Sequence, residues 1–187
     1  PSWLTLSLAE FQVLGTAGFS ASYVYDTSIA LNSNDTPYVT YKDYTTGHKA
    51  TVMKFDGTSW VNVGTPGFSA GIVDYTEIAI DSSNTPYVVY KDGADSNKTT
   101  VMKFDGTSWI NVGNAGFSLG QANFTEIAID SLNVPYVVYQ DGADSNKITV
   151  MKFDGTSWIN VGNAGFSGGF SQYPTLAFDN IDTPYVA

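Results

Sequence analysis

The stretch Val52–Trp60, VMKFDGTSW, returns unchanged at Val101–Trp109 and at Val150–Trp158, so the chain repeats itself every 49 residues. Residues 52–100 and 101–149 differ at only 12 positions, which indicates duplication of a whole structural unit. A fixed period of about 20 to 50 residues is typical of repeat architectures. The tripeptide PYV follows the same period, beginning at Pro37, Pro86, Pro135 and Pro184.

Each repeat contains four short runs of β-branched and aromatic residues, which predict four strands. Turn-forming segments separate these runs, and a proline stands just before the second run, where a missing amide donor costs little. From Gly113 a segment rich in glycine and small residues leads to the next repeat. In the second repeat the predicted strands are Thr76–Ile80, Tyr87–Tyr90, Thr99–Phe104 and Trp109–Val112.

Four antiparallel strands in a repeat of about 40 to 50 residues predict an all-β fold, the β-propeller, with one blade per repeat and no room for helices. The expected organisation is a single domain over residues 1–187. The first predicted strand of each blade would line the central channel, and the fourth strand of each blade would be outermost. We expect complete blades at 22–70, 71–119 and 120–168, and half blades at 1–21 and 169–187.

The two half blades are complementary. The first holds the third and fourth strands of a repeat, Trp3–Leu6 and Phe11–Leu14, and the last holds the first and second, Thr175–Phe178 and Tyr185–Ala187. Their pairing would close a four-bladed ring and remove exposed sheet edges. A piece of a larger ring, or a ring shared by two chains through strand exchange, would show the same repeats.

Composition narrows the classes of partner. The net charge is −10, all eight basic residues are lysine, and no arginine is present for bidentate recognition of phosphate or guanine, so we expect no nucleic acid partner. The absence of cysteine excludes disulfides and thiolate metal sites. No stretch is long and apolar enough for membrane insertion. No signal peptide is visible, and the chain opens with proline, so we expect a processed chain or an excerpt.

The segments PYVVYKD, VMKFDGTSW and NVGNAGFS resemble repeats in secreted bacterial surface proteins and, more distantly, kelch and tachylectin-type propellers. The resemblance covers nearly all of the chain, although the diglycine of a kelch repeat is absent. It implies an extracellular or cell-surface location and a role in binding or scaffolding.

One tryptophan per blade follows the turn before the fourth strand: Trp60, Trp109 and Trp158, with Phe11 at the equivalent position of the first half blade. Indole rings offer an apolar face and a polar edge, so they could stack on sugars between blades. Their alternative role is to pack blades together. The phenylalanines of the repeated GFS tripeptide are expected to plug the gaps between blades.

The loop between the second and third strands carries oxygen-bearing side chains at Asp92, Asp95 and Asn97, and again at Asp141, Asp144 and Asn146. This set is a candidate for ligand binding, and calcium is the cation that such a loop would suit. The loop does not match an EF-hand, and its alternative role is a solvated turn. We expect no other cofactor.

Glu77 and Glu126 occupy equivalent positions of the first strand, near the expected channel. Paired carboxylates can act as acid and base in glycoside hydrolysis. One of them would need a pKa raised by its environment, and the sequence gives the two glutamates identical neighbours. Pairing with lysines or exposure to a hydrated channel is the alternative.

Three functional classes follow. A non-enzymatic module that binds glycans or a surface protein needs only repeated loops and clefts, so it is the expected function. A structural spacer in a surface protein is the first alternative, and a hydrolase acting on glycans is the second. Hydrolysis needs an asymmetric constellation, which near-identical repeats do not display.

Overall fold

In a computed structural model, residues 13–187 are described, and they form three four-stranded antiparallel sheets and one two-stranded sheet. Blade 1 consists of β1 (Val24–Leu31), β2 (Pro37–Asp43), β3 (Lys49–Phe55) and β4 (Trp60–Asn62). Blade 2 consists of β5 (Val73–Ile80), β6 (Pro86–Asp92), β7 (Lys98–Phe104) and β8 (Trp109–Asn111). Blade 3 consists of β9 (Ala122–Ile129), β10 (Pro135–Asp141), β11 (Lys147–Phe153) and β12 (Trp158–Asn160). The half blade pairs β13 (Leu176–Phe178) with β14 (Pro184–Val186).

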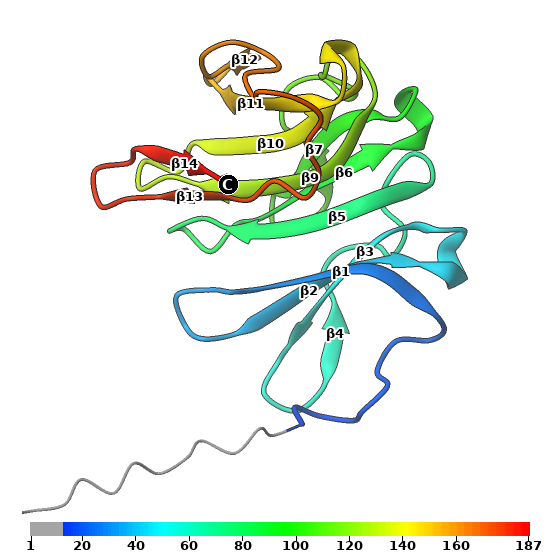
Figure 1. Cartoon of the computed structure of the whole chain (residues 1–187). Coiled ribbons are helices and arrows are strands. Elements are labelled where there is room, and N and C mark those ends of the chain that lie inside the picture. The colour runs from blue at the N-terminus through cyan, green and yellow to red at the C-terminus, as the bar shows by residue number, and fades with distance from the viewer. Residues whose placement is uncertain (1–12) are drawn as a thin grey trace, which may run out of the picture.

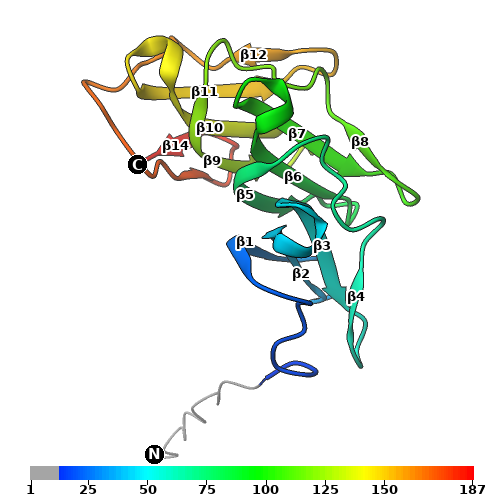
Figure 2. The ribbon, with the colours of Figure 1, turned by 90° about the vertical axis from the view of Figure 1, so that its right-hand side faces the viewer.

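The sheets follow one another face to face, from β1–β4 through the green and yellow sheets to β13 and β14 (Figure 1). The turned view shows β4, β8 and β12 on the outer side of the stack and β1, β5 and β9 on the inner side (Figure 2). This order, with four strands laid antiparallel from the inside outward, is that of β-propeller blades. The all-β prediction is therefore confirmed.

The innermost strand differs from its prediction. It begins at Val73 rather than Thr76, because a β-bulge between Asp74 and Glu77 lets the chain continue pairing with β6. Aspartate is uncommon in strands, and a bulge interrupts the alternation on which strand prediction depends. The second strand begins at Pro86 itself, a position where proline is tolerated.

Each loop between the second and third strands contains one 3-10 turn, although the sequence predicted no helices. These turns are η1 (Tyr44–Thr46), η2 (Gly93–Asp95) and η3 (Gly142–Asp144). Each lasts three residues, begins after a capping aspartate and ends at a residue in the left-handed conformation. The aspartate before each turn is the residue from which these turns could have been predicted, because its side chain accepts a backbone N–H of the following turn.

The core lies between blades rather than within one sheet. Tyr87, Val89 and Val101 of blade 2 pack against Ile127 and Tyr139 of blade 3. The equivalent residues Tyr38, Val52, Ile78 and Tyr90 belong to the preceding cluster, which lies between blades 1 and 2. The half blade contributes Leu176 to a third, smaller cluster with blade 3. Because burial of apolar area dominates folding, each blade is stabilised mainly by its neighbours.

The half blade has two paired strands in the described residues. Its predicted partner Trp3–Leu6 lies outside residues 13–187, as do Phe11 and Gln12 of the second predicted strand, and Val13 and Leu14 are not in a strand. Closure of the ring by these half blades, and the domain limits that depend on it, therefore stay predictions.

Candidate functional site

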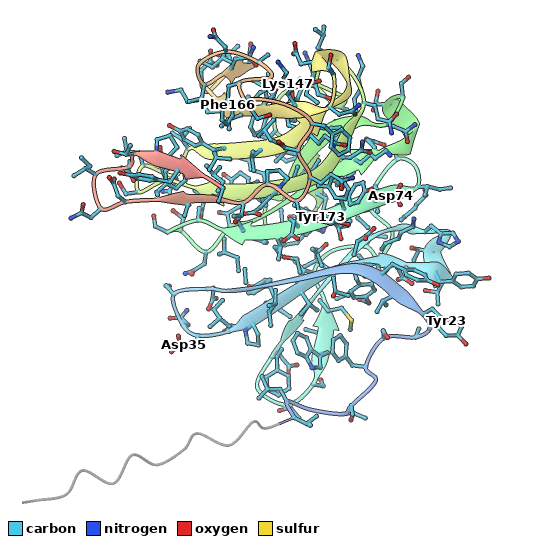
Figure 3. All side chains as sticks on the ribbon, viewed as in Figure 1. Tyr23, Asp35, Asp74, Lys147, Phe166 and Tyr173 are labelled. Atoms are coloured by element: carbon cyan, nitrogen blue, oxygen red, sulfur yellow. The ribbon has the colours of Figure 1, made fainter. Side chains whose placement is uncertain are left out.

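A cavity of about 290 Å³ lies where the inner strands of all four repeats approach one another, and we call it the hub cavity. Each repeat contributes residues from the same three consecutive positions, 49 residues apart along the chain. Tyr173, on the segment that leads into β13, is labelled beside these strands in Figure 3. The lining residues are Asp26, Thr27, Tyr75, Thr76, Glu77, Phe124, Thr125, Glu126, Tyr173, Pro174 and Thr175.

Backbone irregularity shapes this cavity. The first of the three positions has a positive φ in every repeat: 48° at Asp26, 54° at Tyr75, 51° at Phe124 and 53° at Tyr173. In β1, β5 and β9 this residue lies in a β-bulge. A side-chain-bearing residue in the left-handed region costs about 1 to 2 kcal/mol. Bulges re-aim side chains and are common beside active sites, so the strain is a feature of interest.

Hydrogen bonds between blades satisfy the bulged backbone. The amide of Tyr75 donates to Oδ2 of Asp26 at 3.0 Å, and the hydroxyl of Thr76 donates to the carbonyl oxygen of Asp26. One blade further on, the hydroxyl of Thr125 donates to the carbonyl oxygen of Tyr75 at 2.6 Å. Both threonines are buried. The wall of the cavity is thus fixed by contacts from one blade to the next.

Aromatic rings form a row along the cavity. The ring centroids of Tyr75 and Phe124 are 4.8 Å apart, and those of Phe124 and Tyr173 are 4.2 Å apart. The first repeat carries Asp26 at this position, so one carboxylate ends the row. Tyr173, which also lines the cavity, is 76% exposed. Lys91 lies with its Nζ 5.7 Å from the centroid of Tyr75.

The two glutamates of the sequence analysis both line the cavity, in different environments. Oε1 of Glu126 accepts hydrogen bonds from the hydroxyl of Thr175 at 3.0 Å and from the amide of Leu176 at 2.9 Å. Glu77 makes no such bond to the amide of Ile127 in the described part of the chain. Identical local sequences therefore hold two carboxyl groups that are bound differently.

Burial raises the pKa of Glu77 above its ordinary value. The hydroxyl of Ser28 lowers this pKa in part, and the neighbouring carboxylates of Glu126 and Asp26 raise it further. The surroundings of Glu77 therefore favour its protonated form more than water does.

The tryptophans proposed as sugar platforms lie on the outer side of the blades. The indole N–H of Trp109 donates to the carbonyl oxygen of Val63 at 2.8 Å, and that of Trp158 donates to Val112 at 2.7 Å. Phe68 stacks on Trp109, with centroids 4.3 Å apart. In this arrangement the tryptophan contacts a carbonyl oxygen and a phenylalanine that both lie in the connection from the preceding blade. We call it the outer clasp.

The outer clasp recurs at Trp158 with Phe117, where the ring centroids are again 4.3 Å apart, and at Trp60 with Phe19, where they are 4.4 Å apart. Trp60 donates to the carbonyl oxygen of Leu14 at 3.0 Å. Both the polar edge and one face of each indole are therefore engaged inside the protein. Trp109 and Trp158 are also buried, which makes packing the role that their geometry serves.

In the loops between the second and third strands, the first aspartates, Asp92 and Asp141, are buried. Asp92 accepts the amide of Ala94 and the hydroxyl of Thr100, both at 2.9 Å. Asp141 accepts the equivalent amide and hydroxyl in blade 3. Burial raises the pKa of Asp92, and these hydrogen bonds oppose the effect. Both carboxylates stabilise the turn in which they lie.

The remaining loop residues lie at the surface between blades. Asp95 packs against Gly116, where an added Cβ would come within 2.7 Å of the Asp95 Cβ. Asn97 and Asn146 adopt positive φ and donate their amides to the carbonyl oxygens of Asp92 and Asp141. Asp144 is the blade 3 counterpart of Asp95. Within residues 13–187, no cluster of three or more histidine, aspartate or glutamate side chains is arranged to hold a metal ion.

No protein-family model matches this sequence, and no curated protein matches it. Solved structures do share its fold. An endo-1,4-beta-xylanase from Bacteroides thetaiotaomicron is 12% identical and covers 90% of this chain with a TM-score of 0.56; the chain spans 66% of it. An ulvan lyase of polysaccharide lyase family PL25 is 13% identical over 87% of this chain, with a TM-score of 0.54; the chain spans 42% of it.

A fucose lectin from Kordia zhangzhouensis is 13% identical, covers 74% of this chain and 99% of its own length, and has a TM-score of 0.49. At such identities the likeness of the xylanase and the lyase shows a shared fold. No helix of the described residues is both long and apolar enough to cross a membrane.

The expectation that this chain is not an enzyme is contradicted, because the xylanase and the lyase with this fold are enzymes. The sequence argument against catalysis rests on the identical sequence neighbours of Glu77 and Glu126. Neighbours from other blades make their environments different, and these neighbours cannot be read from the repeat itself.

Proposed function

We propose that the protein acts on glycans, and that the hub cavity binds a neutral saccharide. The observation that carries the proposal is the composition of this one cavity, which combines an aromatic row with carboxylate and hydroxyl groups. Sugars present apolar faces to aromatic rings and hydroxyl groups to polar side chains, so they match such a lining. The volume of about 290 Å³ suits the end of a saccharide chain.

The charge of the cavity supports a neutral ligand. Asp26, Glu77 and Glu126 line it, and none of its lining residues is basic. The whole sequence contains no arginine, the residue that best binds a carboxylate or sulfate in a bidentate manner. Uronic acids, sialic acids and sulfated sugars would therefore meet repulsion from these carboxylates. The cation beside Tyr75, Lys91, already donates to Oδ1 of Asn123 at 3.0 Å.

Calorimetric titration of the purified chain with neutral monosaccharides and disaccharides, beside uronates and sialic acid, tests this proposal. We expect a neutral sugar to bind and the acidic sugars not to bind. Tyr173→Ala should weaken binding by about 2- to 10-fold, because a stacked ring contributes about 0.5 to 1.5 kcal/mol.

Tyr185→Ala is the matched control for this titration, since Tyr185 is 59% exposed on the same half blade but outside the cavity. It should leave the affinity unchanged. Equal losses in both variants, or binding of no sugar at all, would refute the proposed site. Tryptophan fluorescence is a poor probe here, because no tryptophan lines the cavity.

An extracellular or cell-surface location is proposed along with this function, since polysaccharides of the environment are met there. Binding of a surface protein and oligomers formed by strand exchange stay predictions of the sequence.

A further inference from the structure

We propose that the hub cavity hydrolyses a glycosidic bond, with Glu77 as the acid that protonates the leaving oxygen and Glu126 as the base that deprotonates the attacking water. The inference rests on the proposed glycan binding and deepens it. Both side chains line one cavity that also offers an aromatic face for a sugar ring.

Hydrogen bonds fix the orientation of the Glu126 carboxylate, as a catalytic base requires. Its Oε1 atom accepts two hydrogen bonds, from the hydroxyl of Thr175 and the amide of Leu176, and this fixes the plane of the carboxylate. In the described residues Oε2 has no bound donor, so it is available to accept a proton from water.

Glu77 has the surroundings that an acid requires. It is half-buried, and the charged groups that face it are the carboxylates of Glu126 and Asp26. These two neighbouring carboxylates disfavour a negative charge on Glu77. The hydroxyl of Ser28 is the contact that favours the ionised form of Glu77. Carboxyl groups whose environments separate their proton affinities are the usual acid and base of glycoside hydrolysis.

The reaction balances with water as the only co-substrate. The proton of Glu77 passes to the glycosidic oxygen while the bond between that oxygen and the anomeric carbon breaks. Water forms the new bond to the anomeric carbon from the opposite side and gives one proton to Glu126. The products are a reducing sugar of inverted configuration and an alcohol, and exchange with solvent restores both carboxyl groups.

The experiment measures hydrolysis by the full chain of those neutral sugars that bind, each as a methyl glycoside and as a 4-nitrophenyl glycoside. Glu77→Gln should lower kcat/KM for the methyl glycoside by about 100- to 10,000-fold, the range of general acid catalysis. The loss should be much smaller for the nitrophenyl glycoside, whose leaving group needs little protonation. The variant should keep its affinity for sugar.

Glu126→Gln should slow both substrates alike, because water must lose its proton whatever the leaving group. Asp105→Asn, on an exposed turn outside the cavity, is the control and should change neither rate. Wild-type activity should fall as pH rises through the pKa of Glu77, and this limb should be absent in Glu77→Gln.

The outcomes separate the two proposals. A sugar that binds without turnover as either glycoside overturns the catalytic inference and leaves glycan binding intact. Turnover that survives Glu77→Gln, or a product of retained configuration by NMR, overturns the roles assigned to the glutamates. Failure of every sugar to bind refutes the proposed function itself.

Discussion

The outer clasps and the hub cavity use the same 49-residue repeat in opposite ways. At the clasps, Trp109 and Trp158 have the same exposure, the same stacking distance and the same kind of carbonyl partner. At the hub, equivalent positions carry Asp26, Tyr75 and Phe124, and even the identical Glu77 and Glu126 are bound differently. The repeats agree where blades are held together and differ around the hub cavity.

The largest effect should come from the clasps. Trp109→Ala and Trp158→Ala should each lower the free energy of unfolding by about 3 to 5 kcal/mol, because each empties a packed site between blades. Their losses in urea titrations should agree, since their surroundings agree. Trp60→Ala should cost less, because Trp60 and its partner Phe19 are less buried. Clearly unequal losses of unfolding free energy in the Trp109 and Trp158 variants would contradict the equivalence of the two clasps.

A second pair of changes compares residues within one loop. Asp141→Ala should lower the free energy of unfolding by about 2 kcal/mol, since it leaves the amide of Ala143 and the hydroxyl of Thr149 without their acceptor. Asp144→Ala should change it little, because that side chain accepts no such pair of bonds. Thermal and urea denaturation measure both. Similar losses would place Asp144 in the same structural role as Asp141.

The two glutamates should respond with opposite signs. Glu126→Gln should lower the free energy of unfolding by about 1 kcal/mol at pH 7, because a neutral amide is a weaker acceptor for two donors. Glu77→Gln should raise the free energy of unfolding at pH 7. The raised pKa means that the folded protein favours the protonated group, so stability is present below the unfolded pKa and is lost as pH rises through the folded pKa.

Near pH 4 the effect of Glu77→Gln should be much smaller, because pH 4 lies below the unfolded pKa and Glu77 is then mostly protonated in both states. Denaturation curves of wild type and both variants at pH 4 and pH 7 measure the difference. Equal and parallel responses of the two glutamates would remove the asymmetry on which the catalytic inference depends.

The smallest effect should come from the turns beside the clasps. The amides of Thr107 and Ser108 donate to Asp105 at 2.8 Å, and these bonds lower the pKa of this exposed carboxyl group. Its contribution is present above the unfolded pKa and is lost as pH falls through the folded pKa. Asp105→Asn should therefore flatten the acid limb of the stability curve slightly. The equivalent Asp154→Asn should do the same, and a difference between them would show that clasp regions diverge after all.

The strands, turns and blade order of this fold were predictable because each follows from residues that are close in sequence. The bulge at Tyr75 was not, since nothing local distinguishes a left-handed tyrosine from one in a regular strand. The inequality of Glu77 and Glu126 was also hidden. It arises from Ser28 and Thr175, which lie 49 residues away on adjacent blades and differ from each other.

The direction of the outer clasp also has a consequence for synthesis. Each clasp joins a carbonyl at the end of one blade to an indole that lies 46 residues later in the chain. A blade emerging from the ribosome therefore cannot fasten its outgoing connection until nearly one whole further repeat has been translated. During that interval its phenylalanine is uncovered, and nascent chains stalled between repeats should be the species most exposed to aggregation and most in need of a chaperone.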